Sequence, residues 1–574
     1  MARCNVSPGE QIETWYYKID NYNSVCLSDI NGYLTCCKIN LSGYYITYLA
    51  SATGTSLVYK DLHILPIIMI TTEQTTNSQV VTRKSQHSFL AMEISYYISS
   101  WLFTLILALA PLFFLLILKQ KCANTKHKLP PGQMGLPWLG ETMDFYRAQQ
   151  ANRLFEDFVR PRMARHGKIF KTRLMGSPTV IVSGAEANRF FLSNEFKLVM
   201  SSWPSSSVRL MGKNSIMEKH GEQHRHVHGL IASSLGSSSA ESLVPKLSKL
   251  VQRHLDAHWS GQERIKLYNF TKNLTFHIVF ECLLGIDVEL GMKEIFERIL
   301  EGVFAPPVTV PGTRFSRAMR ARKEIERMLV RIVRKKKEEM ERKNSGGGGG
   351  GSEEGGVVLL PRYVAAMLRG EMSEEEVIDN IVLLVFAAYD TTSFAIAMTF
   401  RMLAHHPNCY QLLLKEHMDV KSRKGEGEDI SGEDIKKMSY TWKVARESIR
   451  LFPPIFGSFR KAIVDIEYEG FTIPKGWKVL WTTYGTHYDP EHFQDPMSFN
   501  PDRFEEAMPP YVYVPFGGGP RVCAGSQLAR MNILVLVHHV VTRYDWSLIH
   551  PDEPITVDPL PFPVHGMPMR ISPK

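Results

Sequence analysis

The sequence has few cysteines, no large excess of charge of either sign and almost no long hydrophobic runs. Eight Cys in 574 residues are too sparse for a small scaffold held together by disulfides. Lys and Arg number 67 against 58 Asp and Glu, and no zinc-finger spacing, RNP motif or basic stripe with interleaved aromatics occurs, so no nucleic-acid partner is expected. A mean hydropathy of −0.14 excludes a polytopic membrane protein, and a hydrophobic share of 44% excludes disorder throughout.

One segment, residues 96–118, is both long and apolar, with 23 residues and no charge. As a helix it would rise about 34 Å, enough to cross a hydrocarbon core of about 30 Å. A buried core helix is the alternative, but such helices rarely run this long without a polar face. We therefore predict a single-pass transmembrane helix. The positive-inside rule places the part that follows it in the cytosol, because four basic residues come directly after the segment: Lys119, Lys121, Lys126 and Lys128.

The chain divides into four parts around this anchor. Residues 1–91 contain no helical period, repeat or motif and are left unassigned. Because an anchor of this kind normally begins close to a chain start, we hypothesise that the functional protein starts at Met92. Residues 92–127 hold the anchor and its basic flank, and the Pro-rich residues 128–141 predict a hinge. Residues 142–574 form one large body.

The large body is predicted to be mostly α with small β-sheets. Long stretches have the apolar period of a helix, and two short runs are rich in β-forming residues. A Gly-rich stretch at 346–356 has too much backbone entropy to order and predicts a surface loop. The helical stretches are 240–258, 294–304, 316–343, 374–405 and 524–543, and the β-rich runs are 168–183 and 466–483.

The strongest chemical signal is the segment from Phe516 to Gly525, in which four Gly and one Arg surround Cys523. A Gly-rich turn at a helix start supplies the N–H donors and positive charge that stabilise a thiolate. Gly also allows the backbone to approach a large planar ligand closely. A buried, inert thiol is the alternative, although the tight Gly and Arg frame disfavours it.

The pattern F-x-x-G-x-R-x-C-x-G resembles the haem-binding loop of the cytochrome P-450 monooxygenases, and every specified position matches. The resemblance implies that the body has the cytochrome P-450 fold and binds haem b, iron protoporphyrin IX. In that family the Cys thiolate is the axial iron ligand, a role that falls to Cys523. Phe516 would then pack against the ring, and Arg521 would bind a haem propionate.

Two further motifs of the family occur in the expected order. Glu447 and Arg450 match E-x-x-R, and residues three apart on a helix share a face, so the two can pair. Arg503 lies in a segment that resembles the P-x-R-F element. The resemblance implies that these three residues form a buried structural triad.

The sequence from Ala387 to Thr392 resembles the oxygen-activation motif A-G-x-D-T-T. In the family the acid and the neighbouring alcohol relay protons, which gives Asp390, Thr391 and Thr392 catalytic positions. Two departures occur: Ala388 stands where Gly is usual, and Tyr389 is bulky at a variable position. We expect both to affect oxygen geometry more than reaction class.

Two histidines and an arginine complete the expected haem site. His224 and His228 lie four residues apart, on one helical face, where the family often has W-x-x-x-R or H-x-x-x-R facing the propionates. Histidines at this spacing also suggest zinc, but H-E-x-x-H and a third ligand are absent. Arg460 matches a further propionate-binding Arg.

Residues 311–322 resemble the plant clan that oxidises sterols, triterpenoids, diterpenoids and related hormones. The implied reaction inserts one atom of O2 into a C–H bond of a lipophilic terpenoid or steroid. Substrate contacts are expected from three loops, roughly 200–215, 302–312 and 455–459. The resemblance also places the enzyme in the endoplasmic reticulum membrane, facing the cytosol.

Electrons would come from an NADPH-dependent flavoprotein reductase on the same membrane, since no G-x-G-x-x-G unit for a nicotinamide or flavin appears in this chain. Two alternatives stay open. One is a haem-thiolate isomerase or dehydratase that needs neither O2 nor reductase. The other is a non-enzymatic haem-binding or lipid-binding membrane protein.

Overall fold

The computed structural model describes residues 127–345, 357–425 and 427–574, the backbone of four N-terminal strands, and Trp101 and Thr104. The chain separates into two compact units, Met1–Phe114 and Leu115–Lys574. Apart from Trp101 and Thr104, the predicted transmembrane helix lies outside the described residues, as does the Gly-rich stretch 346–356.

The described part of the first unit is a four-stranded antiparallel sheet in the order β1-β2-β3-β4. No structure was predicted for these residues, although β3 alternates between apolar and polar residues. Aromatic and β-branched residues recur in these strands, and two residues separate the first pair and the last pair, the spacing of tight hairpins. The strands are β1 (Glu13–Ile19), β2 (Tyr22–Ser28), β3 (Thr35–Leu41) and β4 (Tyr44–Ala50).

The second unit contains a five-stranded sheet with the order β5-β6-β12-β9-β7, in which only β6 and β12 are parallel. Its pairing joins residues from both halves of the unit and sets Ser201 opposite Arg460. The five strands are β5 (Ile169–Leu174), β6 (Ser177–Val182), β7 (Val199–Ser201), β9 (Gly457–Ala462) and β12 (Lys478–Thr482). Three smaller sheets use β8 (Arg264–Lys266), β10 (Ile466–Tyr468), β11 (Phe471–Ile473), β13 (Tyr544–Leu548), β14 (Ile555–Val557), β15 (Pro561–Pro563) and β16 (Pro568–Pro573).

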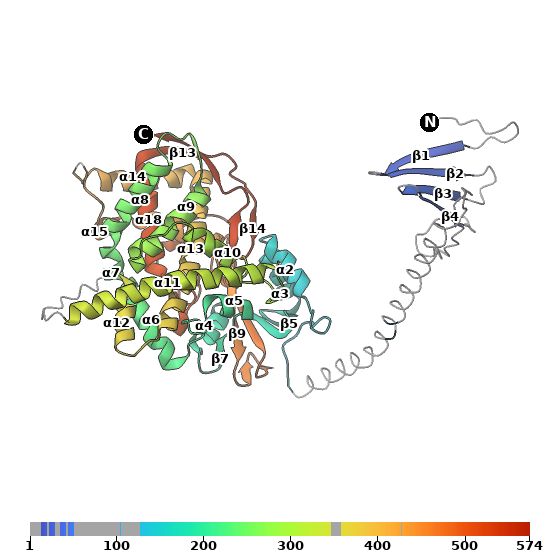
Figure 1. Ribbon diagram of the computed structural model, residues 1–574, viewed down its shortest axis with the longest axis horizontal. Helices are drawn as coiled ribbons and strands as arrows, with labels where there is room; N and C mark the ends of the chain where they lie inside the picture. The colour runs from blue at the N-terminus through green and yellow to red at the C-terminus, as the bar shows by residue number, and fades with distance from the viewer. Residues whose placement is uncertain are drawn as a thin grey trace, which may run out of the picture. The chain divides into compact units, whose positions relative to one another are not determined.

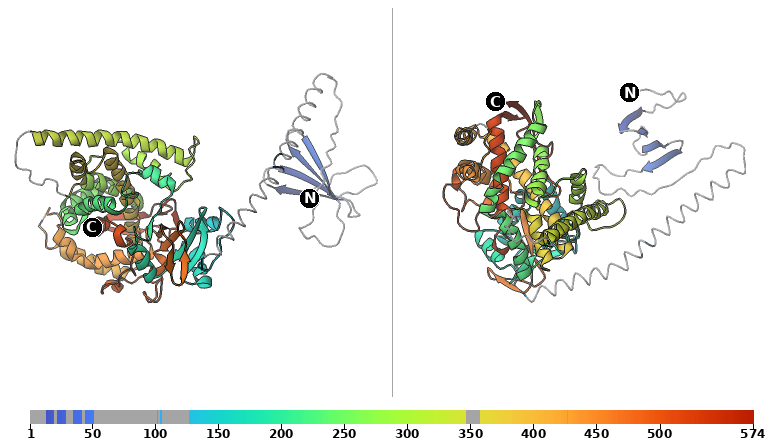
Figure 2. Two further views of the ribbon diagram at one scale, coloured as in Figure 1. Left: turned by 90° about the horizontal axis from the view of Figure 1, so that it is seen from below. Right: turned by 60° about the vertical axis from the view of Figure 1, so that its left-hand side comes forward.

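Helices make up most of this unit, so the predicted mostly α class with small sheets is confirmed (Figure 1). Figure 2 shows the strands of the five-stranded sheet gathered at one side of the unit and most of the helices at the other, while α2, α3 and α4 contact the sheet. The first helices are α2 (Thr142–Gln150), η1 (Leu154–Val159), α3 (Arg160–His166), α4 (Ala185–Ser193), α5 (Ser205–Met211), α6 (Gly221–Leu235), α7 (Ser237–Ser242), α8 (Val244–His258), α9 (Leu267–His277), η2 (Ile278–Leu284) and α10 (Met292–Leu300). They are followed by α11 (Arg314–Ser345), α12 (Leu359–Leu368), α13 (Glu374–His405), α14 (Pro407–Lys421), α15 (Gly432–Lys437), α16 (Ser439–Leu451), α17 (Tyr484–His487), η3 (Pro501–Phe504), η4 (Gly519–Arg521) and α18 (Ser526–Arg543).

The central helix of the core is α13, which begins at a capping box formed by Ser373 and Glu376. Within the described residues it is the one helix long and apolar enough to span a membrane. However, 67% of its most apolar window is buried in the unit, so α13 is a core helix. It packs against α9, α16 and α18, so its position determines which side chains of these helices face the core.

The Pro-rich segment predicted as a hinge is fastened to the sheets. The Lys171 backbone N–H donates to Pro131 O at 2.7 Å, and the Thr472 N–H donates to Lys128 O at 2.8 Å. Gly132 has a φ of +123°, and a Cβ there would lie 2.2 Å from Lys171 O, so glycine is required at this contact. The chain therefore enters the body along a defined path.

A buried ion pair joins α11 to α13. Arg322 Nη2 contacts Asp379 Oδ1, and both side chains are less than a tenth exposed. Arg322 Nε also donates to Leu210 O at 3.0 Å, which ties α5 to the same point. Arg322 closes the clan motif, and its apolar positions Phe315, Ala318 and Ala321 are all buried.

We expect Asp379→Asn to lower the free energy of unfolding by about 3 kcal/mol, because it removes the buried partner of Arg322 and leaves only Glu326, whose side chain is half exposed. Denaturant titration would measure the loss. Glu324→Gln is the matched control, since Glu324 pairs with Arg298 in an ion pair whose side chains are both half exposed. Such a pair contributes about 1 kcal/mol or less. Equal unfolding midpoints for the two variants would contradict the prediction.

Candidate active site

The Cys523 loop, residues 516–525, is closed by its own backbone. The Cys523 N–H donates to Phe516 O at 2.9 Å, and the Val522 N–H donates to Gly519 O at 3.1 Å. Gly519 has a φ of +66°, and a Cβ there would lie 2.0 Å from Leu192 O. The loop thus packs against the end of α4 only because glycine stands at this position.

The Cys523 thiol lies just before α18, whose N-cap is Gly525. Its side chain is exposed, yet burial raises the pKa of the thiol, partly offset by a hydrogen bond from the Gly525 backbone N–H. The exposed side chain leaves space for a ligand beside the sulfur. A ligand that fills this space would meet a soft sulfur donor at a helix N-terminus.

Both arginines predicted to bind propionates converge on one carboxylate that the sequence analysis did not identify. Arg521 Nε lies 2.8 Å from Glu195 Oε1, and Arg460 Nε lies 2.7 Å from Glu195 Oε2. The Arg460 contact is an ion pair without hydrogen-bond geometry, so Arg460 Nε and Glu195 Oε2 are buried without a hydrogen bond. Arg521 also donates to three backbone carbonyls, those of Ile216, Met217 and Lys219.

The predicted histidine pair lies on α6, as the spacing indicated. The rings of His224 and His228 stack with centroids 5.5 Å apart. Burial, with Arg521 nearby, lowers the pKa of His224 to about 4, so this side chain is neutral at physiological pH. His228 Nε2 lies 3.4 Å from Val522 O, which brings α6 to the Cys523 loop. Among the described residues, no group of three His, Cys, Asp or Glu could hold a metal ion, so zinc is not supported.

The face of α13 that carries Thr391 is open. Ala387 is exposed and Ala388 and Thr391 are half-buried, although most of the helix around them is buried. The Thr391 hydroxyl donates to Ala387 O at 2.6 Å, one turn back along the helix. Thr392 is buried, at 5% exposure, and lies off this open face. The open face carries small side chains and one hydroxyl, which leaves room for a small molecule beside the helix.

Asp390 points away from that face, toward α9. Its carboxylate lies 3.2 Å from Lys272 Nζ and accepts a hydrogen bond of 3.4 Å from Tyr268. Burial raises the pKa of Asp390, and Lys272 opposes that shift. Tyr389 is also turned inward: its hydroxyl donates to Glu297 Oε1 at 2.6 Å on α10. Tyr389 therefore does not crowd the open face, contrary to the concern raised by its bulk.

The structure brings the predicted triad together. Arg450 Nε lies 2.7 Å from Glu447 Oε2, and Arg503 Nε lies 3.3 Å from Glu447 Oε1. The Glu447 and Arg450 side chains are fully buried. Arg450 also donates to carbonyls of the segment that leads to the Cys523 loop, those of His487, Pro496 and Ser498. The triad thus fixes the path of the chain toward Cys523.

The three loops predicted to contact substrate meet in space. The hydroxyls of Ser206 and Ser207 both donate to Val303 O at 2.8 Å, which joins the first loop to the second. The Ser202 N–H donates to Phe459 O at 3.1 Å, which joins the first to the third. These hydrogen bonds therefore hold the three segments side by side, although they are far apart in the sequence.

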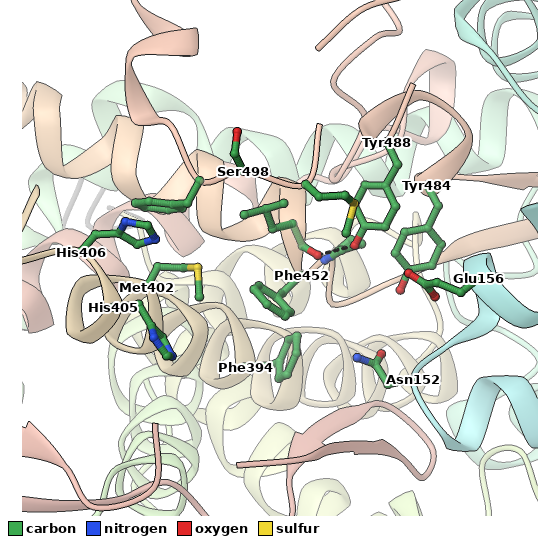
Figure 3. Close-up of a pocket in the computed structure, with 14 residues that line it drawn as sticks. Asn152, Glu156, Phe394, Met402, His405, His406, Phe452, Tyr484, Tyr488 and Ser498 are labelled. Atoms are coloured by element: carbon green, nitrogen blue, oxygen red, sulfur yellow. Dashed lines mark hydrogen bonds between the residues drawn. The ribbon is translucent and has the colours of Figure 1, made fainter. Parts of the chain in front are cut away.

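A separate cavity of about 620 Å³ lies beside the C-terminal half of α13, one turn beyond Thr391 (Figure 3). Phe394, Phe452 and Tyr484 line it, together with His405 and His406. Tyr488, at its edge, is fixed by a hydrogen bond of 2.6 Å to Leu451 O. No residue of the Cys523 loop lines this cavity, so it is distinct from the site around the thiol.

The residues around Cys523 fit a large, flat dianion with a soft metal at its centre. The Cys523 thiol supplies the metal ligand. Two arginines with little exposure, one of them in an ion pair without a hydrogen bond, supply positive charge. The neutral His224 stands beside them. Haem is such a group, and the donor set matches it.

Comparisons with known proteins agree with this geometry. The family model for cytochrome P-450 matches residues 130–572. A taxane 13-alpha-hydroxylase of Taxus cuspidata is 36% identical over 475 residues, which cover 81% of this chain and 96% of that protein. A beta-amyrin 28-monooxygenase of Saponaria officinalis is 34% identical over 470 residues, which cover 80% of this chain and 95% of that protein. Among solved structures, a retinoic acid bound cyanobacterial CYP120A1 has 30% identity and a TM-score of 0.68, covering 78% of this chain and all of that one.

Replacing Glu447 with Ala leaves two arginines of the triad without their buried partner, at a cost of about 3–5 kcal/mol. We expect most of the purified variant to lack haem, because the segment leading to Cys523 loses its anchor. The haem-to-protein absorbance ratio measures this. Glu505→Ala is the control, since Glu505 is mostly exposed and pairs only with Lys443 among the described residues. Wild-type haem content in Glu447→Ala would refute the anchoring role.

Proposed function

The chain belongs to the cytochrome P-450 family and is a haem monooxygenase, and we propose that its substrate is a lipophilic terpenoid or sterol-like molecule. The observation that carries this proposal is that the chain has both the Cys523 loop and, on α13, the adjacent Asp390 and Thr391. Relatives over most of the chain are named as a taxane hydroxylase and a beta-amyrin monooxygenase, and taxanes and beta-amyrin are both terpenoids.

Haem, when bound, supplies an iron centre that activates dioxygen, and Cys523 would be its thiolate ligand. Arg460, Arg521 and His224 would hold the propionates, with His228 beside them, and Phe516 would pack against the ring. The protein's own contribution is then to hold the haem, to exclude water around it and to deliver protons to the face of the haem that lies toward α13.

Proton delivery falls to the two sides of α13. Thr391 holds a proton at Oγ1 on the open face, where its hydroxyl bonds to Ala387 O. Asp390 on the opposite side exchanges protons with Lys272 and Tyr268. Lys272 also lies within 4.0 Å of Glu297, which is partly exposed, so this chain of polar groups reaches toward solvent. Thr392, which is buried next to this pair, would support the helix there.

We also propose the membrane arrangement implied by the sequence. The apolar run 96–118 and its basic flank favour a single-pass anchor in the endoplasmic reticulum, with residues 142–574 in the cytosol. The partners are then an NADPH-dependent flavoprotein reductase, O2 and membrane lipid. Residues 92–127 would form the anchor, residues 128–141 its connection to the body, and residues 1–91 an extension outside the functional protein.

Reductase-supplemented microsomes carrying this chain provide the test, with panels of triterpenoids, diterpenoids and sterols as substrates. We expect NADPH-dependent gain of one oxygen atom in a product from one of these classes. Cys523→Ser is the control for thiolate-dependent chemistry. Turnover of a lipid hydroperoxide without NADPH would instead indicate an isomerase or dehydratase. Good haem loading with no oxidised product from any panel would contradict the proposed substrate class.

Thr391→Ala should keep haem and substrate binding but reduce the yield of product per NADPH, with more hydrogen peroxide released. The reason is that the open face of α13 loses its one hydroxyl, which would lie beside the O2 substrate. Coupling, measured as product and peroxide per NADPH, checks this. Ser393→Ala is a matched control, because its hydroxyl also donates one turn back, to Tyr389 O at 2.7 Å, but points toward α9. Equal coupling in the two variants would remove Thr391 from the proposed role.

A further inference from the structure

We propose that Glu195 is a positioning residue that holds Arg460 and Arg521 in place for the two haem propionates. The proposal rests on the haem site described above and not on the identity of the substrate. It assigns a role to a buried acid that belongs to none of the motifs in the sequence.

Glu195 itself is held rigidly. It lies between α4 and β7, and its side chain is 1% exposed. The Ser201 backbone N–H and hydroxyl donate to Oε1 at 2.8 Å and 3.1 Å. Ser201 in turn pairs with Arg460 across the β7–β9 register. The carboxylate is therefore fixed by the same strand pairing that carries one of the two arginines.

The contacts use the same atom of each arginine. Glu195 meets Arg521 and Arg460 at Nε, and uses a separate oxygen for each. The terminal nitrogens of a guanidinium are the donors suited to a second carboxylate. On Arg521 they already donate to the carbonyls of Ile216, Met217 and Lys219, so the free donor is on Arg460. On Arg460, Nη1 donates to Ser458 Oγ at 2.7 Å, and Nη2 has no hydrogen bond to any described residue. A propionate can therefore bind Arg460 without displacing Glu195.

Charge explains why an acid is needed there. Two guanidiniums with little exposure stand on either side of Glu195, and without a counter-charge they would repel each other and lose hydration. One carboxylate reduces the net charge of the cluster to +1. Two propionates then bring it to −1, so that Glu195 stabilises the arginines before haem binds and remains beside the group afterwards.

Two measurements on Glu195→Gln test this without turnover. We expect the haem reduction potential to become more positive, because a buried negative charge next to the group is removed. We also expect transfer of haem to apomyoglobin to become about tenfold faster or more, the scale on which outer-shell partners affect bound metals. Glu222→Gln is the control: it removes the same charge from an exposed pair on α6 and should leave both values unchanged.

A potential and a transfer rate that both match the wild type would overturn the proposal. If Glu195→Gln does not fold with haem, the double variant Glu195→Gln/Arg460→Gln carries the test, because it removes a cation together with the anion. We expect the double variant to fold and to lose haem faster than Arg460→Gln alone, because Arg521 also loses its partner. Failure of both variants to fold would show that charge pairing is not the reason for Glu195, and would also overturn the proposal. Absence of terpenoid oxidation would leave these readouts untouched.

Discussion

The burial of charge is the constraint on which the rest of the structure depends. A haem pocket must be dry enough to control a reactive thiolate and charged enough to hold two propionates, and an unpaired charge in such a place is costly. The chain meets this constraint with acids that each serve buried arginines. Glu447 lies between Arg450 and Arg503, and Glu195 lies between Arg460 and Arg521.

The two clusters stabilise different parts of the site. The cluster at Glu447 fixes the chain that leads to the Cys523 loop, because Arg450 bonds to three carbonyls along that path. The cluster at Glu195 fixes the arginines that face the other edge of the site. Between them the loop needs only its own backbone bonds and glycines to set the thiol, as the contact of Gly519 with Leu192 O illustrates.

How much of this could be predicted depended on how local each signal was. Glu447 with Arg450, and His224 with His228, were predictable because helical spacing alone places them together. Glu195 was not, because its partner Arg521 lies 326 residues away and no motif marks the acid. Strands β1 to β4 were not predicted, because the apolar and polar residues of β2 and β4 do not alternate clearly and no motif marks this region.

Thr391 and Asp390 show why adjacency in a motif does not mean adjacency in space. Successive residues on a helix point about 100° apart, so the hydroxyl reaches the open face while the acid turns to Lys272 on α9. The same rotation carries Tyr389 to Glu297 and removes its bulk from the open side. In the proposed relay, a proton that reaches Asp390 through α9 would therefore have to pass around the helix to reach Thr391.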